Sequence, residues 1–204
     1  MSCEEEPIYL KKGWTESKFN PETIEMSKGT INEVPIISSK ESLEKALGKP
    51  LEIKFECSKI SYYPTQETKN YDCWVYEPNF GMAFQIDGEK SFLGYCNFEM
   101  KNFKVETPQV NLTKNTKIKD LKKVFPNSYA HRNIGANYPP SEGYEWMYLI
   151  DDLSKERKSS PNKIELIFKD KYLYALHYQW HPIYDESQWK VYQDEKKKHI
   201  NLNK

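Results

Sequence analysis

The side chains that could perform catalysis or bind a metal are few, and their spacing does not bring them together. The chain has four histidines, at positions 131, 177, 181 and 199. If His177 and His181 lie on one strand, they share a face but are about 13 Å apart, too far to ligate one metal ion. Asp151 and Asp152 are adjacent, so on a strand their carboxylates would point to opposite faces and could not act as an acid–base pair.

Sequence motifs of common enzymes are also missing. The chain contains no Gly-x-Ser-x-Gly, no His-Glu-x-x-His and no glycine-rich phosphate loop, and it has only eight glycines. We therefore expect a non-enzymatic protein without a metal or cofactor.

Composition argues against a nucleic-acid partner. The 204 residues carry 30 basic and 30 acidic side chains, and Arg132 and Arg157 are the only arginines. Arginine is the preferred side chain for phosphates and base edges, so a neutral, arginine-poor chain is a poor candidate for binding nucleic acid. Aromatic residues, by contrast, reach 14%, with 15 Tyr and 5 Trp.

The first residues resemble the processed end of a bacterial lipoprotein. Met1, Ser2 and Cys3 precede three glutamates, and no apolar run approaches the roughly 20 residues that span a bilayer. In bacterial lipoproteins a cysteine after a small residue carries the lipid. We expect Cys3 to be the lipid anchor of a periplasmic or surface protein on the bacterial outer membrane; the alternative is an ordinary cytoplasmic start.

Two short amphipathic helices are predicted, 78 positions apart. The first begins after Ser38 or Ser39 and ends at Gly48 and Pro50, which suit a helix N-cap and a helix stop. The second is predicted over Thr113–Phe125. Three apolar positions correspond between the two helices: Leu43 to Leu121, Ala46 to Val124, and Leu47 to Phe125.

A strand-rich stretch follows each helix. Alternating patterns predict strands over 51–57, 71–76, 82–86 and 92–98, then 163–170 and 172–176, with turns at Asp87-Gly88 and Asp170-Lys171. The sequence thus predicts an α+β fold: a tandem repeat of a short helix and an antiparallel meander of three or four strands, with the helices on one face. Residues 1–33 would be a polar tether, 34–100 the first repeat, 101–182 a partly strand-like linker and the second repeat, and 183–204 a polar, partly helical tail.

This layout resembles the beta-lactamase inhibitory protein fold and the small outer-membrane assembly lipoproteins that carry one copy of the unit. The resemblance covers about residues 34–182 and includes Gly48-Lys49-Pro50 and the segment from Phe168 to Leu173. The Gly-Met-Thr turn that often opens the family's helix is absent here. The resemblance implies an exported protein that grips another protein with a concave sheet; it does not imply beta-lactamase as the target.

The cysteines fit that picture. Cys57 and Cys73 fall on neighbouring antiparallel strands, where the family commonly has a disulfide, so we expect these two to be bonded. Cys96 has the opposite strand parity and is expected to be free and buried. Reduced thiols in a cytoplasmic protein remain the alternative.

Strand parity predicts an aromatic binding face. With Val75, Met82, Phe84 and Leu93 in the core, together with Ile164, Leu166 and Phe168, the other side of the sheet would be aromatic. The expected partner-binding residues are Trp74, Tyr76, Phe92, Phe98, Tyr172, Tyr174, Tyr178 and Trp180. The alternatives are that residues 1–33 or the tail cover this face, or that it forms a dimer, and a register error of one residue would exchange the two faces.

The sequence therefore predicts an exported protein, anchored by lipid, that binds another protein through an aromatic sheet face. An inhibitor or immunity-type role follows only by analogy with the fold. The alternatives are a structural subunit of a cell-envelope assembly and a small-ligand or carbohydrate-binding protein.

Overall fold

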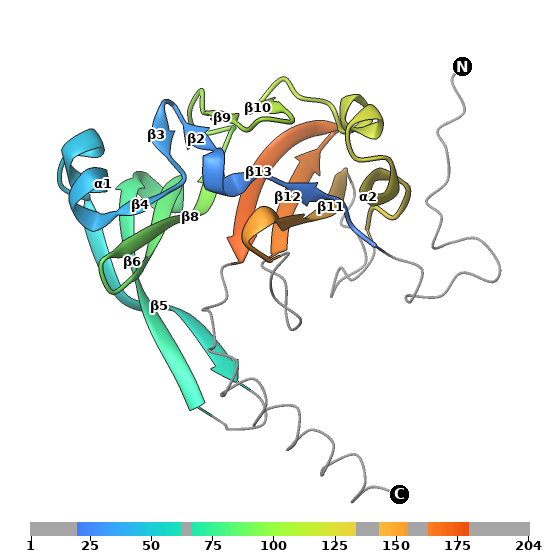
Figure 1. The fold of residues 1–204 in the computed structure, drawn as a ribbon. Helices are drawn as coiled ribbons and strands as arrows, with labels where there is room; N and C mark the ends of the chain where they lie inside the picture. Colours follow the sequence, from blue (N-terminus) through green and yellow to red (C-terminus); the bar gives the residue numbers. More distant parts are fainter. Residues whose placement is uncertain (1–19, 63–66, 134–142, 155–162, 180–204) are drawn as a thin grey trace, which may run out of the picture.

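The computed structural model describes residues 20–62, 67–133, 143–154 and 163–179, with only the backbone described at 56–62, 67–70, 80 and 179 (Figure 1). The fold is mixed α and β and mostly sheet, which confirms the expected class. The predicted tail 183–204 and residues 1–19 lie outside the described residues.

The larger sheet has nine strands, all antiparallel except for the pair β1 and β11. Its spatial order is β1 (Thr23–Ile24), β11 (Tyr144–Asp151), β12 (Lys163–Lys169), β13 (Tyr172–Gln179), β8 (Lys90–Asn97), β7 (Met82–Asp87), β6 (Glu67–Glu77) and β5 (Glu52–Tyr62), and β4 (Ile37–Ser39) also pairs with β8. A smaller sheet has the order β10 (Asn111–Thr113), β9 (Lys104–Glu106), β2 (Thr30–Ile31) and β3 (Val34–Pro35).

Six short helices complete the described fold. They are η3 (Met26–Lys28), α1 (Lys40–Leu47), η4 (Pro78–Phe80), η5 (Ile118–Lys123), α2 (Pro126–Ala130) and η6 (Asp152–Ser154).

Helix α1 confirms the first predicted helix and its two ends. Ser39 is the N-cap, and its hydroxyl accepts the backbone N–H of Ser42 at 3.1 Å. Gly48 ends the helix with φ +79°, a conformation that costs glycine little. Leu43 is fully buried and fixes the side of α1 that faces the core.

The second predicted helix was wrong in its extent. Instead of one helix over 113–125, the chain forms the 3-10 helix η5 and then the short helix α2. Pro126 disfavours the helical region for the residue before it, and Phe125 has φ −130° and ψ 65°. Leu121 and Phe125 are nevertheless buried, whereas Val124 is exposed.

The antiparallel meanders form as expected. Helix α1 is followed by β5, β6, β7 and β8, and η5 with α2 is followed by β11, β12 and β13. Gly88 turns the β7–β8 hairpin, and Asp170 and Lys171, both with positive φ, turn β12 into β13. Strand β13 then pairs with β8, so both meanders belong to one sheet.

Three bulges decide which side chains face the core. The register shifts by one residue at Tyr76, Gly94 and Tyr174, and each shift leaves one residue without a direct partner on the next strand. Strand parity reverses beyond each bulge. Leu166 consequently lies opposite Leu176, and Ala175 lies opposite Ile167.

The N-terminal part of the described chain belongs to the fold, which corrects the predicted tether over residues 20–33. Thr23 and Ile24 extend the edge of the large sheet beside β11, and Ile24, Met26 and Ile31 are buried. Phe103 and Val105 of the predicted linker are also buried. These apolar side chains supply part of the core beside the large sheet.

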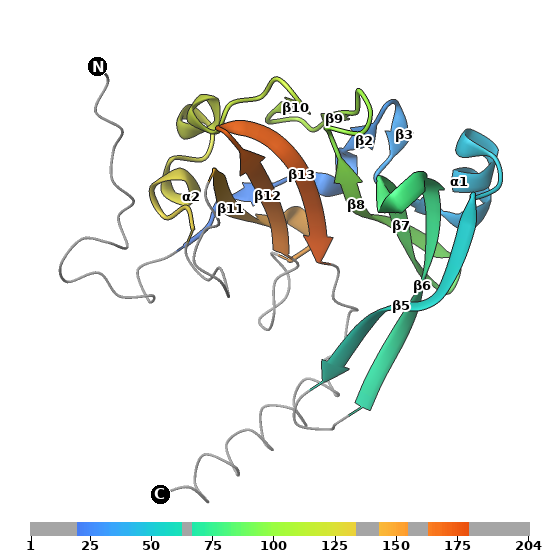
Figure 2. The ribbon, with the colours of Figure 1, turned by 180° about the vertical axis from the view of Figure 1, so that it is seen from behind.

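The two sides of β12 and β13 differ. The segment β1–η3 crosses in front of these strands in Figure 1 and lies behind them in Figure 2. On the covered side, Ile164, Leu166 and Phe168 are fully buried, as expected, whereas Glu165, Ile167 and Lys169 on the other side are only partly buried. That second side is where exposed function-bearing side chains can lie.

Candidate functional site

An aromatic row lies along β11 on the side of the large sheet that β1 and η3 do not cover. Tyr144, Trp146 and Tyr148 alternate with residues of the opposite side and are partly exposed, whereas Met147 and Leu149 are fully buried. The period of two along a strand places the three rings on one face. The neighbouring strand adds Glu165 opposite Tyr148 and Ile167 opposite Trp146.

Neighbouring strands extend this row into a surface. The rings of Tyr144 and Trp146 stack at 6.3 Å with an angle of 28°, and Tyr174 meets Tyr144 edge to face at 5.7 Å. Across β13 and β8, the rings of Tyr95 and His177 are 6.4 Å apart. We name this surface the open face and define it by the residues Tyr95, Tyr144, Trp146, Tyr148, Glu165, Ile167, Tyr174 and His177.

Glu165 is the acidic group of the open face. It accepts a 2.9 Å hydrogen bond from the Tyr148 hydroxyl, and its second oxygen is 3.5 Å from Nδ1 of His177. Burial acts to raise the pKa of Glu165, but these two hydrogen bonds and the charges of His177 and Lys163 outweigh it and hold the pKa below its ordinary value. The carboxylate therefore stays ionised near neutral pH and fixes two side chains of the face.

Two tyrosines of the face, Tyr95 and Tyr148, remain neutral donors. Burial, with a contribution from Glu165, raises the pKa of Tyr148, and burial also raises the pKa of Tyr95. Lys169 lies 5.6 Å from the centre of the Tyr174 ring and pairs with Glu99 at 3.0 Å. The open face thus combines aromatic area, hydroxyl donors and one fixed carboxylate.

The structure corrects most of the aromatic residues that the sequence placed on a binding face. Tyr174 is on the open face, and Tyr172 is exposed at the start of β13. Trp180 lies outside the described residues. The remaining five are buried in the core: Trp74, Tyr76, Phe92, Phe98 and Tyr178.

Bulges and covering segments explain these errors. Beyond the Tyr174 bulge, Tyr178 lies opposite Ile164 on the core side, and its hydroxyl donates to the buried Asp151. Trp74 lies opposite Phe84 and contacts Lys40 of α1, whose Nζ is 5.5 Å from the ring. The missed residues had a readable signal, because Tyr144, Trp146 and Tyr148 stand at alternate positions.

The cysteines agree in part with expectation. Cys73 is disulfide-bonded, and the sheet register places the backbone of Cys57 in an irregular stretch between the pairs Lys54–Cys73 and Ser58–Tyr71. The Cys57–Cys73 pairing itself stays a prediction. Cys96 is free and buried, as expected, and burial raises the pKa of its thiol. Cys3 lies outside the described residues.

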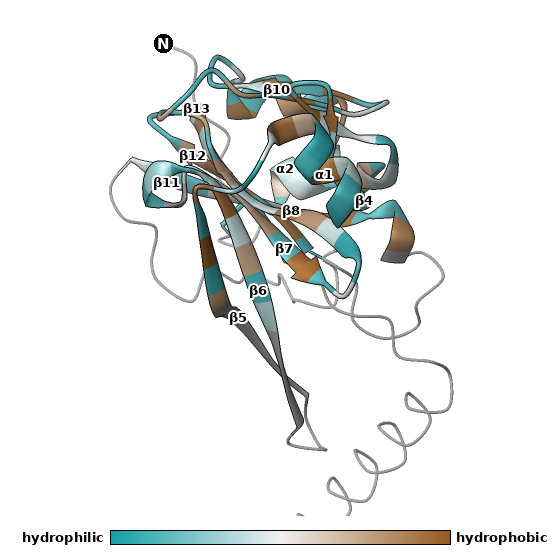
Figure 3. Cartoon of the chain, turned by 90° about the vertical axis from the view of Figure 1, so that its left-hand side faces the viewer, coloured by the Kyte–Doolittle hydropathy of each residue, from teal (hydrophilic) through white to brown (hydrophobic). Residues whose placement is uncertain are grey.

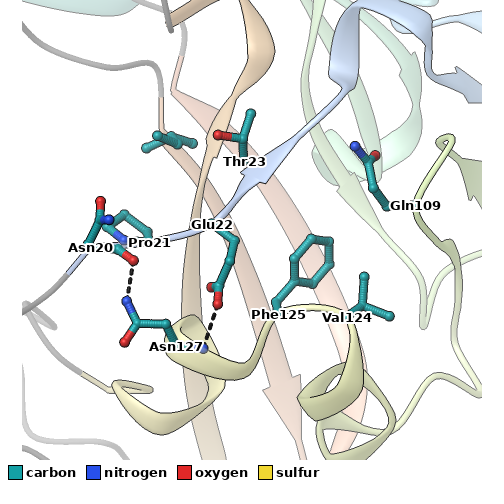
Figure 4. Close-up of a pocket in the computed structure, with 9 residues that line it drawn as sticks. Asn20, Pro21, Glu22, Thr23, Gln109, Val124, Phe125 and Asn127 are labelled. Carbon is teal, nitrogen blue, oxygen red and sulfur yellow. Dashed lines mark hydrogen bonds between the residues drawn. The ribbon is translucent and has the colours of Figure 1, made fainter.

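A cleft lies between the β1 segment and α2 (Figure 4). This open cleft of about 550 Å³ is lined by Asn20, Pro21, Glu22, Thr23, Gln109, Val124, Phe125, Asn127 and Ile150. The Glu22 carboxylate faces the start of α2 and accepts the N–H groups of Asn127 at 2.5 Å and Ser128 at 2.7 Å. Its charge is therefore used to hold β1 against α2.

Arg132 and the metal-ligating side chains are candidate competing sites among the residues that the structure describes. Arg132 is buried, pairs with Glu145 at 3.1 Å and lies 4.7 Å from the ring centre of Tyr129, so it does not present itself to a phosphate. Within the described ranges, no three His, Cys, Asp or Glu side chains gather closely enough to hold a metal ion. None of the described helices has the length and apolar character needed to cross a bilayer.

Comparison with protein-family models, with curated proteins and with solved structures gave no match for this chain.

Proposed function

We propose that this chain is a non-enzymatic binding protein that contacts another protein through the open face. The observation that carries the proposal is the aromatic surface around Tyr144, Trp146 and Tyr174, partly exposed on the side of the sheet that faces away from the core. Aromatic residues are enriched where protein interfaces concentrate their binding energy.

The rings are held in place before a partner arrives. Tyr144 contacts both Trp146 and Tyr174, and Tyr148 is tied to Glu165. Side chains that already occupy their bound positions lose little conformational entropy on association. An exposed aromatic cluster on a soluble domain commonly marks an interaction site.

The resemblance to the beta-lactamase inhibitory protein fold supports the same kind of function. In that comparison the two helix-and-meander units would be repeats that share one sheet, with helices on one face and the partner on the other. An inhibitor or immunity-type role is part of the proposal by analogy. Export, a lipid on Cys3 and a periplasmic or surface location belong to it as well; a structural role in an envelope assembly is the alternative.

A carbohydrate is the second candidate ligand. The nearly parallel Tyr144 and Trp146 rings offer a flat apolar surface, and Glu165, with His177, lies near it on the same face. Sugar rings stack on such surfaces while carboxylates accept their hydroxyl groups. A glycan array probed with the whole chain tests this candidate, and binding that disappears in Trp146→Ser would favour it over a protein partner.

The main experiment compares two double variants with the wild type. Trp146→Ser/Tyr174→Ser removes the centre of the open face, whereas Met100→Ser/Val124→Ser removes two exposed apolar side chains elsewhere and serves as the control. Both should keep the wild-type circular dichroism spectrum. Each protein is used to capture partners from envelope and secreted fractions of the source cell.

The proposal expects one protein that binds the wild type and the control but not the open-face variant. That protein is then purified, and its dissociation constant is measured against all three chains. A rise of at least tenfold for the open-face variant alone supports the proposal. Equal affinity for all three chains, or no binding protein at all, would contradict it.

A further inference from the structure

Strand β5 presents an apolar stripe to solvent at the edge of the large sheet. Leu51, just before the strand, is 67% exposed, Ile53 is 44% exposed and Phe55 is 76% exposed. The alternating sequence had predicted a strand over 51–57 without showing which side is exposed. Figure 3 shows the alternation of apolar and polar residues along β5.

The stripe continues the core side of the sheet. Ile53 lies opposite Trp74, and Trp74 lies opposite Phe84, which is fully buried. The sheet order ends at β5, so among the described strands only β6 pairs with it. Edge strands with exposed apolar side chains pair readily with another strand, and soluble proteins generally cover or charge them.

We propose that β5 pairs antiparallel with β5 of a second copy of this chain, about a two-fold axis at Ile53. The resulting dimer would join the two large sheets edge to edge. A two-fold interface brings the same surface of both copies together, so its sequence must complement itself.

The sequence of β5 is self-complementary in this register. With Ile53 opposite Ile53 of the second copy, Leu51 lies opposite Phe55, and Glu52 lies opposite Lys54. By symmetry there are two such pairs on each side of Ile53, and each of the four joins two apolar residues or an acidic and a basic residue. Opposite charges placed directly across two strands stabilise the pair, and like charges destabilise it.

Registers centred on Glu52 or Lys54 lose this match. A shift that centres the pair on Glu52 sets Glu52 against itself, and one that centres it on Lys54 sets Lys54 against itself and Glu52 against Glu56. A shift by one residue would turn the apolar stripes of the two copies to opposite faces. A parallel, in-register pair also places like charges side by side. The charge pattern thus favours a second copy paired antiparallel at Ile53 over pairs centred on Glu52 or Lys54. A pair centred on Phe55 would also match Lys54 with Glu56, but the register of β5 with β6 is irregular between Lys54 and Ser58.

The charged side chains are placed to make these contacts. Glu52 and Lys54 both retain substantial exposure, and their charged atoms are 3.8 Å apart within one chain. On pairing, each could contact its counterpart on the second copy while its backbone joins the new ladder. The open face carries a different set of residues, so this dimer and the proposed partner binding can be tested separately.

Charge exchange on the full-length chain tests the proposal. The association state of the wild type, Glu52→Lys, Lys54→Glu and the double variant Glu52→Lys/Lys54→Glu is measured by sedimentation velocity from 1 to about 100 µM, a range that covers typical weak homodimers. Circular dichroism checks that each variant is folded. We expect the wild type to dimerise, each single variant to raise the dissociation constant at least tenfold, and the double variant to restore it.

Mixing the two single variants gives the sharpest result. In a heterodimer of Glu52→Lys with Lys54→Glu, both charged pairs are again opposite in sign, so the mixture should dimerise although neither variant does so alone. A monomeric wild type would overturn the proposal, and so would single variants that dimerise as the wild type does. If the wild type is monomeric and Ile53→Lys lowers its melting temperature, the stripe is covered by the chain itself and not by a second copy.

Discussion

The carboxylate of Glu22 is expected to hold the N-terminal strand on the fold. It accepts the N–H groups of Asn127 and Ser128 at 2.5 and 2.7 Å, and so caps the first turn of α2 from a position more than 100 residues away in the sequence. Hydrogen bonds to a charged group contribute about 1.5–3 kcal/mol each. Because Glu22 is only partly buried, we take the lower value and expect Glu22→Ala to cost about 3 kcal/mol.

That loss can be measured by thermal denaturation. In a chain of this size 1 kcal/mol shifts the melting temperature by about 2–4 °C, so Glu22→Ala should melt about 6–12 °C lower. Glu22→Gln keeps one acceptor oxygen and should lose about half as much. Hydrogen exchange should become faster in β1 and α2 before the rest of the sheet.

The control is a carboxylate that pairs only at the surface. Glu99 contacts Lys169 at 3.0 Å and both side chains are well exposed, so Glu99→Ala should cost no more than about 1 kcal/mol. If Glu22→Ala melts within 2 °C of Glu99→Ala, the reasoning about the cap is refuted.

Three further predictions concern a buried core residue, a glycine with positive φ and the loss of stability at low pH. Phe98→Ala should lower the free energy of unfolding by about 3–5 kcal/mol because Phe98 is fully buried, whereas Tyr172→Ala should lower it by less than about 1 kcal/mol. Equal losses of unfolding free energy in urea would contradict the burial of Phe98. Gly143→Ala should cost about 1–2 kcal/mol, because φ is +83° and the new Cβ would lie 2.9 Å from Oδ1 of Asp170, and an unchanged urea midpoint would refute this. Since the pKa of Glu165 in the folded state is below its ordinary value of 4.5, its contribution is complete above pH 4.5 and is lost as pH falls through the folded pKa. Glu165→Gln should therefore lose less stability than the wild type on acidification. If the free energies of unfolding of the two proteins fall in parallel from pH 6 to 3, the lowered pKa of Glu165 is contradicted.

Local sequence rules predicted the elements whose conformation depends on near neighbours. The cap of α1 at Ser39, the glycine stop at Gly48 and the turns at Gly88 and Asp170-Lys171 all formed where the residue types indicated. Each depends on backbone preferences within a few residues. The core side of β12 was also correct, because its alternation is regular from Ile164 to Phe168.

The predicted binding face was wrong for a reason that no single strand reveals. A bulge adds one residue to a strand without changing its hydrophobic composition, so the shifts at Tyr76, Gly94 and Tyr174 left no clear mark in the pattern. Beyond the last of them, Tyr178 lies on the core side. Pairing of distant strands, and not local pattern, decided which aromatic rings are buried.

The amino-acid sequence alone determined the α+β class, the α1 helix, the antiparallel hairpins and the scarcity of catalytic groups. Only the tertiary structure showed that both meanders share one sheet, that residues from Thr23 to Ile31 complete the fold, and that Leu51, Ile53 and Phe55 are exposed. The physical reason is that a residue's conformation follows from its neighbours in sequence, whereas its burial follows from the segments that pack on it. Those segments come from distant parts of the chain, and their positions depend on the whole fold.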